Sequence, residues 1–290
     1  MIKLGNSDIS LKLGNDTVDA VYLGNSLVYS GGTPPTPPVP PHDYSQDYLT
    51  FTALESGTFQ FTNSVDYSLD SGSTWTTLAA NTPTPSIAAG DKILWKATGL
   101  TPTSSSGIGR FSSTGQFDVE GNAMSLLYGD NFVGETDLTG KNHAFIKLFS
   151  GCTGVTSAEN MSLPATTLAE RCYYQMFYGC TSLTTAPELP ATTLANNCYW
   201  GMFTYCTSLT TAPTLPAATL VSNSYREMFY GCTNLNYIKC LATNISANNC
   251  TTSWVTNVAS NGTFVKDANM TSWPSGASGI PTNWTVQDNV

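Results

Sequence analysis

Three copies of one phrase lie end to end between residues 151 and 229 and decide the fold. They read GCTGVTSAENMSLPATTLAERCYYQMF (151–177), GCTSLTTAPELPATTLANNCYWGMF (179–203) and YCTSLTTAPTLPAATLVSNSYREMF (205–229). Phe177, Phe203 and Phe229 are 26 residues apart, and Phe149 precedes Phe177 by 28 because the first copy carries a two-residue insertion. A constant period in this range is typical of chains that fold into stacked turns. We therefore expect a short solenoid over residues 136–258.

Comparison of the copies separates inward-facing from outward-facing positions, because a position packed against neighbouring turns tolerates few residue types. The constant positions, which we predict to form the core, are Cys180/Cys206/Cys232, Leu183/Leu209/Leu235, Leu189/Leu215, Leu194/Leu220, Tyr173/Tyr199/Tyr225, Met176/Met202/Met228 and Phe177/Phe203/Phe229. The variable positions, which should face solvent or a partner, are Tyr174/Trp200/Arg226, Gln175/Gly201/Glu227 and Tyr178/Thr204/Tyr230.

The stretch Met176-Phe177-Tyr178-Gly179-Cys180-Thr181-Ser182-Leu183 occurs twice more in similar form at the same spacing. It resembles the unit of BspA-like leucine-rich repeats, in which aF-x-x-C-x-x-L is followed by a strand and a proline turn. The resemblance covers residues 149–254. From about Asp47 onward the chain is also similar to the non-repeat parts of such proteins from gut bacteria of the Bacteroides type and their phages. The resemblance implies an extracellular binding or adhesion surface and not an enzyme.

The charge of the chain argues against two classes of partner. Charged residues make up 11%, compared with roughly 25% in ordinary globular domains, and the net charge is −9. Such a chain would repel phosphate backbones and anionic membranes, so we expect neither nucleic-acid binding nor membrane insertion. The opening residues, MIKLGNSDIS, lack the basic and apolar regions of a secretory signal. This start favours a virion component, released with the particle, over an exported surface protein.

Residues 1–31 contain a smaller repeat, Leu4-Gly5-Asn6, Leu13-Gly14-Asn15 and Leu23-Gly24-Asn25. Because Gly-Asn marks tight turns, the segment is predicted to form β-hairpins, too small to be stable alone. It resembles the opening of many phage tail and neck-associated proteins, which implies an anchor that binds capsid or tail proteins through residues 1–30. A β-meander packed on the next domain is the alternative. Residues 32–43 are rich in proline and predict an extended spacer.

Residues 44–135 alternate apolar and polar residues between Gly and Ser clusters, which predicts an antiparallel β-sandwich. Within them, Ser68-Leu69-Asp70-Ser71-Gly72-Ser73-Thr74-Trp75 matches the Asp-box pattern S-x-D-x-G-x-T-W. We expect Asp70 to accept turn amides, Gly72 to adopt positive φ and Trp75 to pack on the hairpin. Asp boxes recur in sialidase propellers, but this chain has one box, and its three arginines are spread over different segments. We interpret the box as structural.

The catalytic and metal-binding residue types are sparse. The chain has two histidines, His42 and His143, and neither lies in a recognisable catalytic arrangement. The eight cysteines stand at positions 152, 172, 180, 198, 206, 232, 240 and 250. An even number leaves disulfides open, but Ser224 occupies one place in the column of Cys172, Cys198 and Cys250, which favours buried free thiols. Since no Cys-x-x-Cys is present, we expect no metal. The lack of a catalytic arrangement and the resemblance lead us to expect no cofactor and no enzymatic activity.

Two further features complete the prediction for the repeats. Residues 259–290 should cap the solenoid, with Trp254, Phe264, Trp273 and Trp284 as the lid, because a last turn must cover its apolar face. On the outer surface, equivalent residues of stacked turns should form ladders. The predicted ligand-binding residues are Tyr174, Trp200 and Arg226, flanked by Tyr178, Tyr205 and Tyr230.

Aromatic faces stack on the C–H side of sugar rings and arginine binds acidic or hydroxyl groups, so a cell-surface glycan is the expected ligand, with a host protein as the alternative. We expect Trp200→Ala to weaken attachment at little cost in stability. The rings could instead merely cover the outer edge, and the threonine-rich strand face around Thr184 and Thr210 is another candidate site. The predicted function is that of a homo-oligomeric virion protein of a tailed phage, as a fibre, adhesin or capsid or tail decoration. The alternative is a BspA-like adhesin on a bacterial cell surface.

Overall fold

The computed structural model describes residues 12–13, 16–17, 20–23, 26–30 and 42–289, within two compact units, Met1–His42 and Asp43–Val290. In the first unit, β1 (Lys12–Leu13) pairs antiparallel with β2 (Asp16–Thr17), and β3 (Ala20–Leu23) with β4 (Ser26–Ser30). These pairs agree with the predicted hairpin strands. The Gly-Asn turns and the prolines of the predicted spacer lie outside the described residues.

The chain is mainly β, as the sequence predicts. The only α-helix among the described residues is α1 (Ser125–Tyr128), accompanied by the 3-10 turns η1 (Tyr44–Gln46) and η2 (Gly129–Asn131). In this described part, no helix has the length and apolar character needed to cross a membrane.

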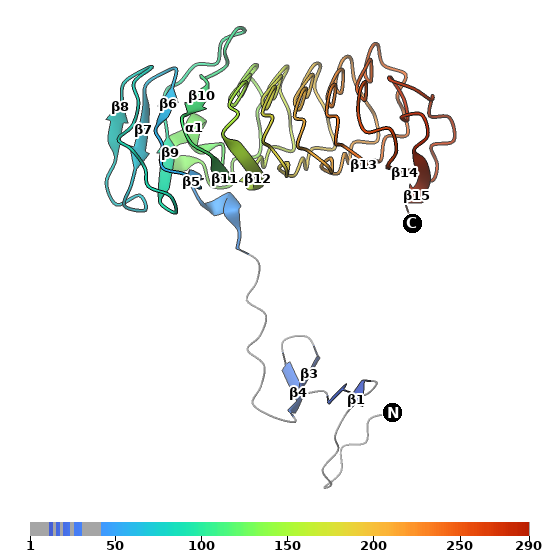
Figure 1. Cartoon of the computed structure of the whole chain (residues 1–290), viewed down its shortest axis with the longest axis horizontal. Helices are drawn as coiled ribbons and strands as arrows, with labels where there is room; N and C mark the ends of the chain where they lie inside the picture. Colours follow the sequence, from blue (N-terminus) through green and yellow to red (C-terminus); the bar gives the residue numbers. More distant parts are fainter. Residues whose placement is uncertain (1–11, 14–15, 18–19, 24–25, 31–41, 290) are drawn as a thin grey trace. The chain divides into compact units, whose positions relative to one another are not determined.

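The second unit contains a six-stranded sheet in the order β12-β11-β5-β9-β7-β8 (Figure 1). Its strands are β5 (Leu49–Ala53), β7 (Val65–Ser68), β8 (Thr76–Leu78), β9 (Lys92–Lys96), β11 (Phe117–Asn122) and β12 (Val155–Ser162). Neighbours are antiparallel, as predicted for residues 44–135, except that β12 runs parallel to β11. Since β12 comes from the first repeat, the repeats continue the sheet of the preceding region.

A separate pair, β6 (Phe59–Phe61) and β10 (Phe111–Ser113), packs against the inner face of this sheet. Phe51 of β5 is fully buried, and its ring centroid lies 5.4 Å from that of Phe59 and 4.8 Å from that of Phe111. Phe111 in turn stacks on Phe149 of the repeats at 5.7 Å. One apolar core therefore runs from the strands into the repeats.

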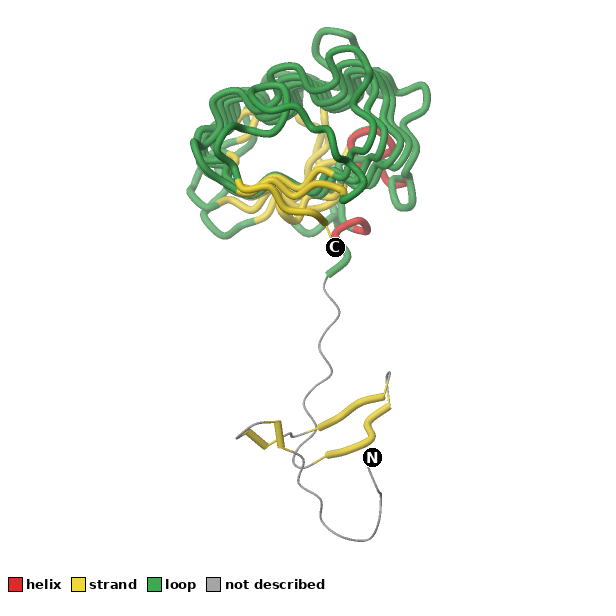
Figure 2. Tube along the Cα trace, turned by 90° about the vertical axis from the view of Figure 1, so that its right-hand side faces the viewer, coloured by secondary structure: helices red, strands yellow, loops and turns green. Residues whose placement is uncertain are grey.

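Residues 143–257 follow successive turns that lie side by side along the second unit (Figure 1) and superpose when viewed along it (Figure 2). The backbone amides of residues 171–180 alternate between two kinds of acceptor. Tyr173 N donates to Cys198 O of the next turn at 3.0 Å, whereas Tyr174 N donates to Arg171 O of its own turn at 3.2 Å. Residues 197–206 and 223–232 repeat this alternation. The buried backbone donors are thus paired without forming a helix or a continuous strand.

Three residues in each of these turns, spaced four apart, have positive φ. They are Arg171, Gln175 and Gly179, then Asn197, Gly201 and Tyr205, then Asn223, Glu227 and Gly231. In the first of these turns, buried pairs such as Met176 and Phe177 are followed by partly exposed pairs such as Tyr178 and Gly179.

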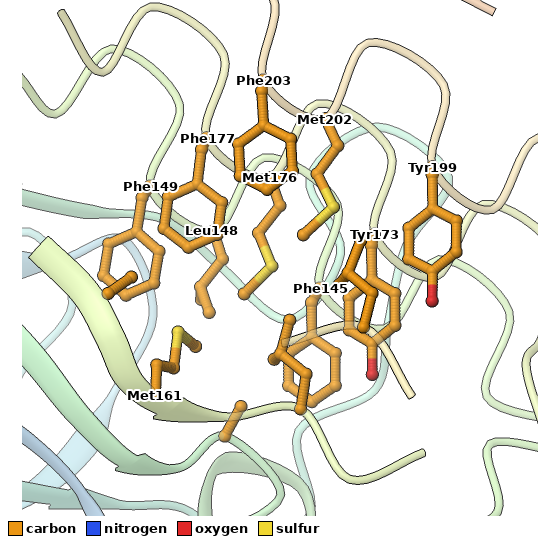
Figure 3. Close-up of a cluster of buried hydrophobic side chains, with 14 of the residues drawn as sticks. Phe145, Leu148, Phe149, Met161, Tyr173, Met176, Phe177, Tyr199, Met202 and Phe203 are labelled. Atoms are coloured by element: carbon orange, nitrogen blue, oxygen red, sulfur yellow. The ribbon is translucent and has the colours of Figure 1, made fainter. Parts of the chain in front are cut away.

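The constant columns of the repeat are the core, as predicted. Phe149, Phe177, Phe203 and Phe229 stack nearly parallel, with successive centroids 5.3, 5.6 and 5.8 Å apart. A second row begins at Phe145 and continues through Tyr173 and Tyr199, and methionines lie between the rows (Figure 3). Adjacent turns therefore add like side chains to like, which is why a fixed period is needed.

The strand side of the turns is less regular than the repeat suggests. After β12, the middle turns are joined on this side by isolated parallel bridges such as Ser157↔Thr185 and Thr211↔Tyr237. Continuous pairing resumes only at β13 (Tyr237–Cys240), β14 (Thr263–Asp267) and β15 (Thr285–Asn289), which form a parallel sheet. The prolines at 187, 190, 213 and 216 explain the interruption, because proline cannot donate to a sheet ladder.

The predicted lid residues pack at the C-terminal end. Trp254 is fully buried, continues the tyrosine row by stacking near Tyr225 at 6.3 Å, and stacks on Trp273 at 5.6 Å. Its Nε1 donates to Gly279 O at 2.8 Å. Phe264 is also fully buried, and Trp284 is nearly so. The four residues therefore pack near one another at this end, with Trp273 only partly buried, and the cap over residues 259–290 stays a prediction.

Candidate functional site

The outward-facing pairs of three successive turns bring the predicted site residues together on one surface. The backbone alternation buries Tyr173 and Met176 and leaves Tyr174 and Tyr178 partly exposed. Backbone amides of one turn donate to carbonyl groups of the next, as Gln175 N does to Trp200 O. Because every turn repeats this pattern, side chains at equivalent positions line up along the stack. Two parallel rows of side chains result.

The first row, here called the tryptophan strip, consists of Tyr174, Trp200 and Arg226. The rings of Tyr174 and Trp200 meet edge to face, with centroids 5.3 Å apart and an interplanar angle of 80°. The guanidinium carbon of Arg226 lies 4.4 Å from the Trp200 ring centroid, in a cation–π arrangement. All three side chains are half-buried. The aromatic surface of Trp200 is therefore largely occupied by its own neighbours.

Glu227 is hydrogen-bonded to two residues of this strip, although it was not among the residues predicted for the site. Its Oε1 accepts a 3.2 Å hydrogen bond from Arg226 Nε, and its Oε2 accepts one of 3.3 Å from Trp200 Nε1. Glu227 belongs to the variable column of Gln175, Gly201 and Glu227. Membership of that column does not indicate that its side chain bonds to a residue of another turn. The sequence feature that could have indicated this pairing was the positively charged residue beside it at position 226.

The second row, here called the tyrosine ladder, consists of Tyr178, Tyr205 and Tyr230. Tyr205 lies between the other two, with ring centroids 5.6 Å from Tyr178 and 5.5 Å from Tyr230, and both pairs are edge to face at 87°. Tyr205 is 42% exposed, more than any other aromatic side chain of the repeats. The ladder offers aromatic surface that no other part of the described chain covers completely.

The middle ring of the ladder belongs to a residue that stands one position later in the sequence than the repeat period predicts. Thr204, not Tyr205, is the equivalent of Tyr178 and Tyr230, and it was expected to face outward. It is instead buried, because its Oγ1 donates a 2.6 Å hydrogen bond to Glu227 O of the next turn. Gly201 of the neighbouring variable column is also buried. The prediction of outward-facing positions was wrong for these two residues.

Tyr205 occupies a position at which the other turns have glycine. Its φ is +61°, and the equivalent Gly151, Gly179 and Gly231 have φ of +75°, +70° and +74°. A Cβ atom added to Gly231 would lie 2.5 Å from Cδ1 of Tyr205. The ring of Tyr205 therefore rests over a glycine that leaves room for it.

The phenols of Tyr205 and Tyr174 remain neutral near physiological pH. Partial burial raises the pKa of Tyr205, and the neighbouring Tyr230 and Tyr178 add to the shift. Partial burial likewise raises the pKa of Tyr174. Neutral hydroxyls can both donate and accept hydrogen bonds, which suits a ligand rich in hydroxyl groups.

The threonine-rich strand face is the alternative surface named by the sequence. Thr184 Oγ1 donates to Thr156 O at 2.9 Å, and on the adjoining bend Thr207 Oγ1 donates to Thr181 O at 3.4 Å. These hydroxyls link neighbouring turns, whereas Thr210 is exposed. Hydrogen bonding within the stack therefore uses part of the polarity of this face.

The Asp-box turn has the local structure predicted from the sequence. Asp70 Oδ1 accepts from Thr74 N at 2.8 Å and from Ser68 Oγ at 2.7 Å, and Gly72 has φ of +86°. The two Thr74 hydrogen bonds and that from Ser68 lower the pKa of Asp70 to about 2. Trp75 lies on the turn, with Tyr48 at 4.9 Å and Lys96 Nζ 4.2 Å from its ring centroid. These contacts account for the motif within the fold.

The remaining chemistry-bearing residues are dispersed or buried. Within residues 42–289 no group of three His, Cys, Asp or Glu side chains has the arrangement of a metal site. His143 lies at the start of the turns, where its N donates to Glu170 O at 2.9 Å. The eight cysteines are all buried thiols. No protein-family profile, curated protein or solved structure matches the chain.

Proposed function

We propose that this chain is a non-enzymatic attachment protein of a tailed-phage particle, in which a β-sandwich and a short BspA-like leucine-rich-repeat solenoid display a surface for host glycans. The observation that carries the proposal is the tyrosine ladder. Three rings from three successive turns lie in contact along the stack, and the central one is 42% exposed. The core beneath is already closed by the phenylalanine rows, so packing alone does not account for a ladder of rings on the outside.

A glycan suits this surface better than a folded protein does. A protein-binding hot spot is centred on aromatic or arginine side chains that fill pockets, whereas these rings form a narrow row along the turns. Aromatic rings with neutral hydroxyl edges complement sugars, which present C–H faces and hydroxyls. The six residues of the tryptophan strip and the tyrosine ladder would then form the binding face.

Attachment to host cells tests the proposal. Fluorescently labelled full-length protein should bind host cells and their isolated capsular polysaccharide, and replacing the three ladder tyrosines by alanine should abolish binding. Tyr237→Ala is the matched control, because it removes a half-buried tyrosine from the strand side of the same turns. Binding lost in the control and kept in the triple variant would place the site on the strand face.

We further propose that residues 1–30 mount the protein, as a homo-oligomer, on capsid or tail proteins of the particle. The chain divides into two compact units. This division supports a mounting role for the first unit that is independent of the second. Deletion of residues 1–30 should leave the second unit folded, as judged by circular dichroism, but remove the protein from purified particles. Normal copy number of the truncated protein in particles would contradict the assignment.

A further inference from the structure

We infer that the tyrosine ladder binds an uncharged, linear glycan that lies along the direction in which the turns stack, and that Arg226 does not clamp an acidic sugar. This inference rests on the proposed function and specifies its ligand. Three observations support it: the carboxylates beside the arginines, the geometry of the rings and the backbone of Tyr205.

Both arginines on this face lie in ion pairs, but only Arg226 is hydrogen-bonded to its carboxylate, because Arg171 Nε is buried without a hydrogen-bond partner. Arg226 donates to Glu227 and lies over Trp200, while the Nε of Arg171 lies 3.8 Å from Glu170 Oε1. An acidic sugar at Arg226 would have to displace Glu227 or be placed beside its negative charge. The net charge of −9 adds long-range repulsion. Lys147 belongs to the turn before Tyr178, and so its charge lies toward one end of the ladder. The electrostatics therefore favour a neutral ligand.

The ring geometry favours a chain over a single terminal sugar. Successive rings are 5.6 and 5.5 Å apart and perpendicular, so the ladder presents a face and an edge in turn. A single sugar ring can stack on one tyrosine only. A linear chain that follows the stack can place a C–H face on one ring and hydroxyl groups against the phenol of the next. The site is therefore long and narrow, with its length set by the number of turns.

The backbone of Tyr205 shows that the placement of the middle ring is costly. The left-handed region is unfavourable for residues other than glycine, and the equivalent positions in other turns are glycine. A tyrosine at 204 would have repeated the arrangement of Tyr178 and Tyr230 without this strain. Positive φ at this position belongs to the fold, and Gln175 and Glu227 adopt positive φ in the same turns. What is particular to Tyr205 is a ring that lies over Gly231. The perpendicular middle ring is thus the feature that we assign to ligand recognition.

Affinity electrophoresis with defined polysaccharides tests the inference. Full-length protein, which migrates to the anode because of its negative charge, is run in native gels containing neutral probes (laminarin, mannan or dextran) or acidic probes (polygalacturonate or alginate). We expect a neutral probe to retard it. Tyr205→Gly should weaken that binding about three- to tenfold, the value of one aromatic contact. Arg110→Gln, at an exposed arginine outside both rows, should leave it within about twofold.

Tyr205→Gly is chosen because glycine is the residue of the equivalent positions, so the variant should keep or raise the melting temperature. Retardation by acidic probes alone, lost in Arg226→Gln, would overturn the inference and leave the proposed attachment function standing. Neutral binding that Tyr205→Gly does not change would overturn the role of the ladder. If no probe retards the protein, the inference fails, and failure to bind host cells as well would remove the proposed function.

Discussion

Cys206 Sγ donates a 3.1 Å hydrogen bond to the backbone oxygen of Phe177 in the preceding turn. The same bond joins Cys180 to Phe149 at 3.1 Å and Cys232 to Phe203 at 3.0 Å. Phe177 O also accepts from Cys180 N at 3.0 Å, so it is bonded both within its turn and across to the next. The cysteine of each repeat is therefore a small side chain that fits the core and links two turns.

Replacing a cysteine that makes this hydrogen bond should lower the free energy of unfolding more than replacing a cysteine of the same column that does not make it. Cys152 heads the same column, but its Sγ lies 3.7 Å from Ser113 Oγ instead of bonding a phenylalanine carbonyl. We expect Cys206→Ala to lower the free energy of unfolding by about 1 kcal/mol more than Cys152→Ala does, the net value of one hydrogen bond. Urea denaturation of both variants measures the difference. Equal losses would show that the thiols act only by filling space.

Gly231→Ala should disturb the tyrosine ladder as well as the backbone. The substitution places a Cβ 2.5 Å from Tyr205 Cδ1 and imposes a φ of +74° on alanine. The backbone term alone should cost about 1–2 kcal/mol, and displacement of the ring adds to it. Thermal or urea denaturation gives the total.

Gly151→Ala is the matched control for that variant. Gly151 has φ of +75°, and nothing lies within 4 Å of a Cβ built there. It should therefore show the backbone cost without the ring cost. In the background of Tyr205→Gly, the two alanine variants should become equally unstable. A persistent excess for Gly231→Ala would mean that some other neighbour is responsible.

The Asp70 turn should stabilise the fold in a defined pH range. Because the pKa of Asp70 in the folded chain is about 2, below the ordinary value of 3.8, the ionised carboxylate contributes stability that is complete above about pH 4 and is lost as the pH falls through 2. Asp70→Asn should therefore lower the melting temperature by a constant amount from pH 7 to pH 5. The difference from the wild-type protein should shrink between pH 4 and pH 2.

Thr74→Val supplies the check on this mechanism. It removes the 2.7 Å hydrogen bond from Thr74 Oγ1 to Asp70 Oδ2 and keeps the one from Thr74 N. The pKa of Asp70 in the folded chain should then rise toward its ordinary value, so the loss of stability on acidification should be smaller and should end at a higher pH. If neither variant changed the pH dependence of stability, Asp70 would not be the group responsible for it.

Comparison of the repeats predicted the core well, because positions such as Cys206 and Phe203 pack against their own equivalents and cannot vary. It failed at Thr204 and Tyr205, where a ring is moved by one residue. Periodicity assumes that each turn has the same local conformation, and it cannot show that Gly231 leaves space into which a neighbouring ring moves. The pairing of Glu227 with Trp200 and Arg226 was missed for a related reason, since hydrogen bonds between side chains of different turns leave no period.

The alternation of amide donors has a consequence for how such a surface can change over generations. Each turn donates its amides to carbonyl groups of its successor and offers the equivalent carbonyl groups to the amides of its predecessor, as Tyr173 N to Cys198 O and Tyr199 N to Ser224 O illustrate. Duplication of one 26-residue segment of the gene would therefore insert a turn between two existing ones without a new kind of interface. Each insertion would bring another aromatic side chain to the outer row, so the reach of the protein along a polymer could grow or shrink in whole turns while both ends stay unaltered.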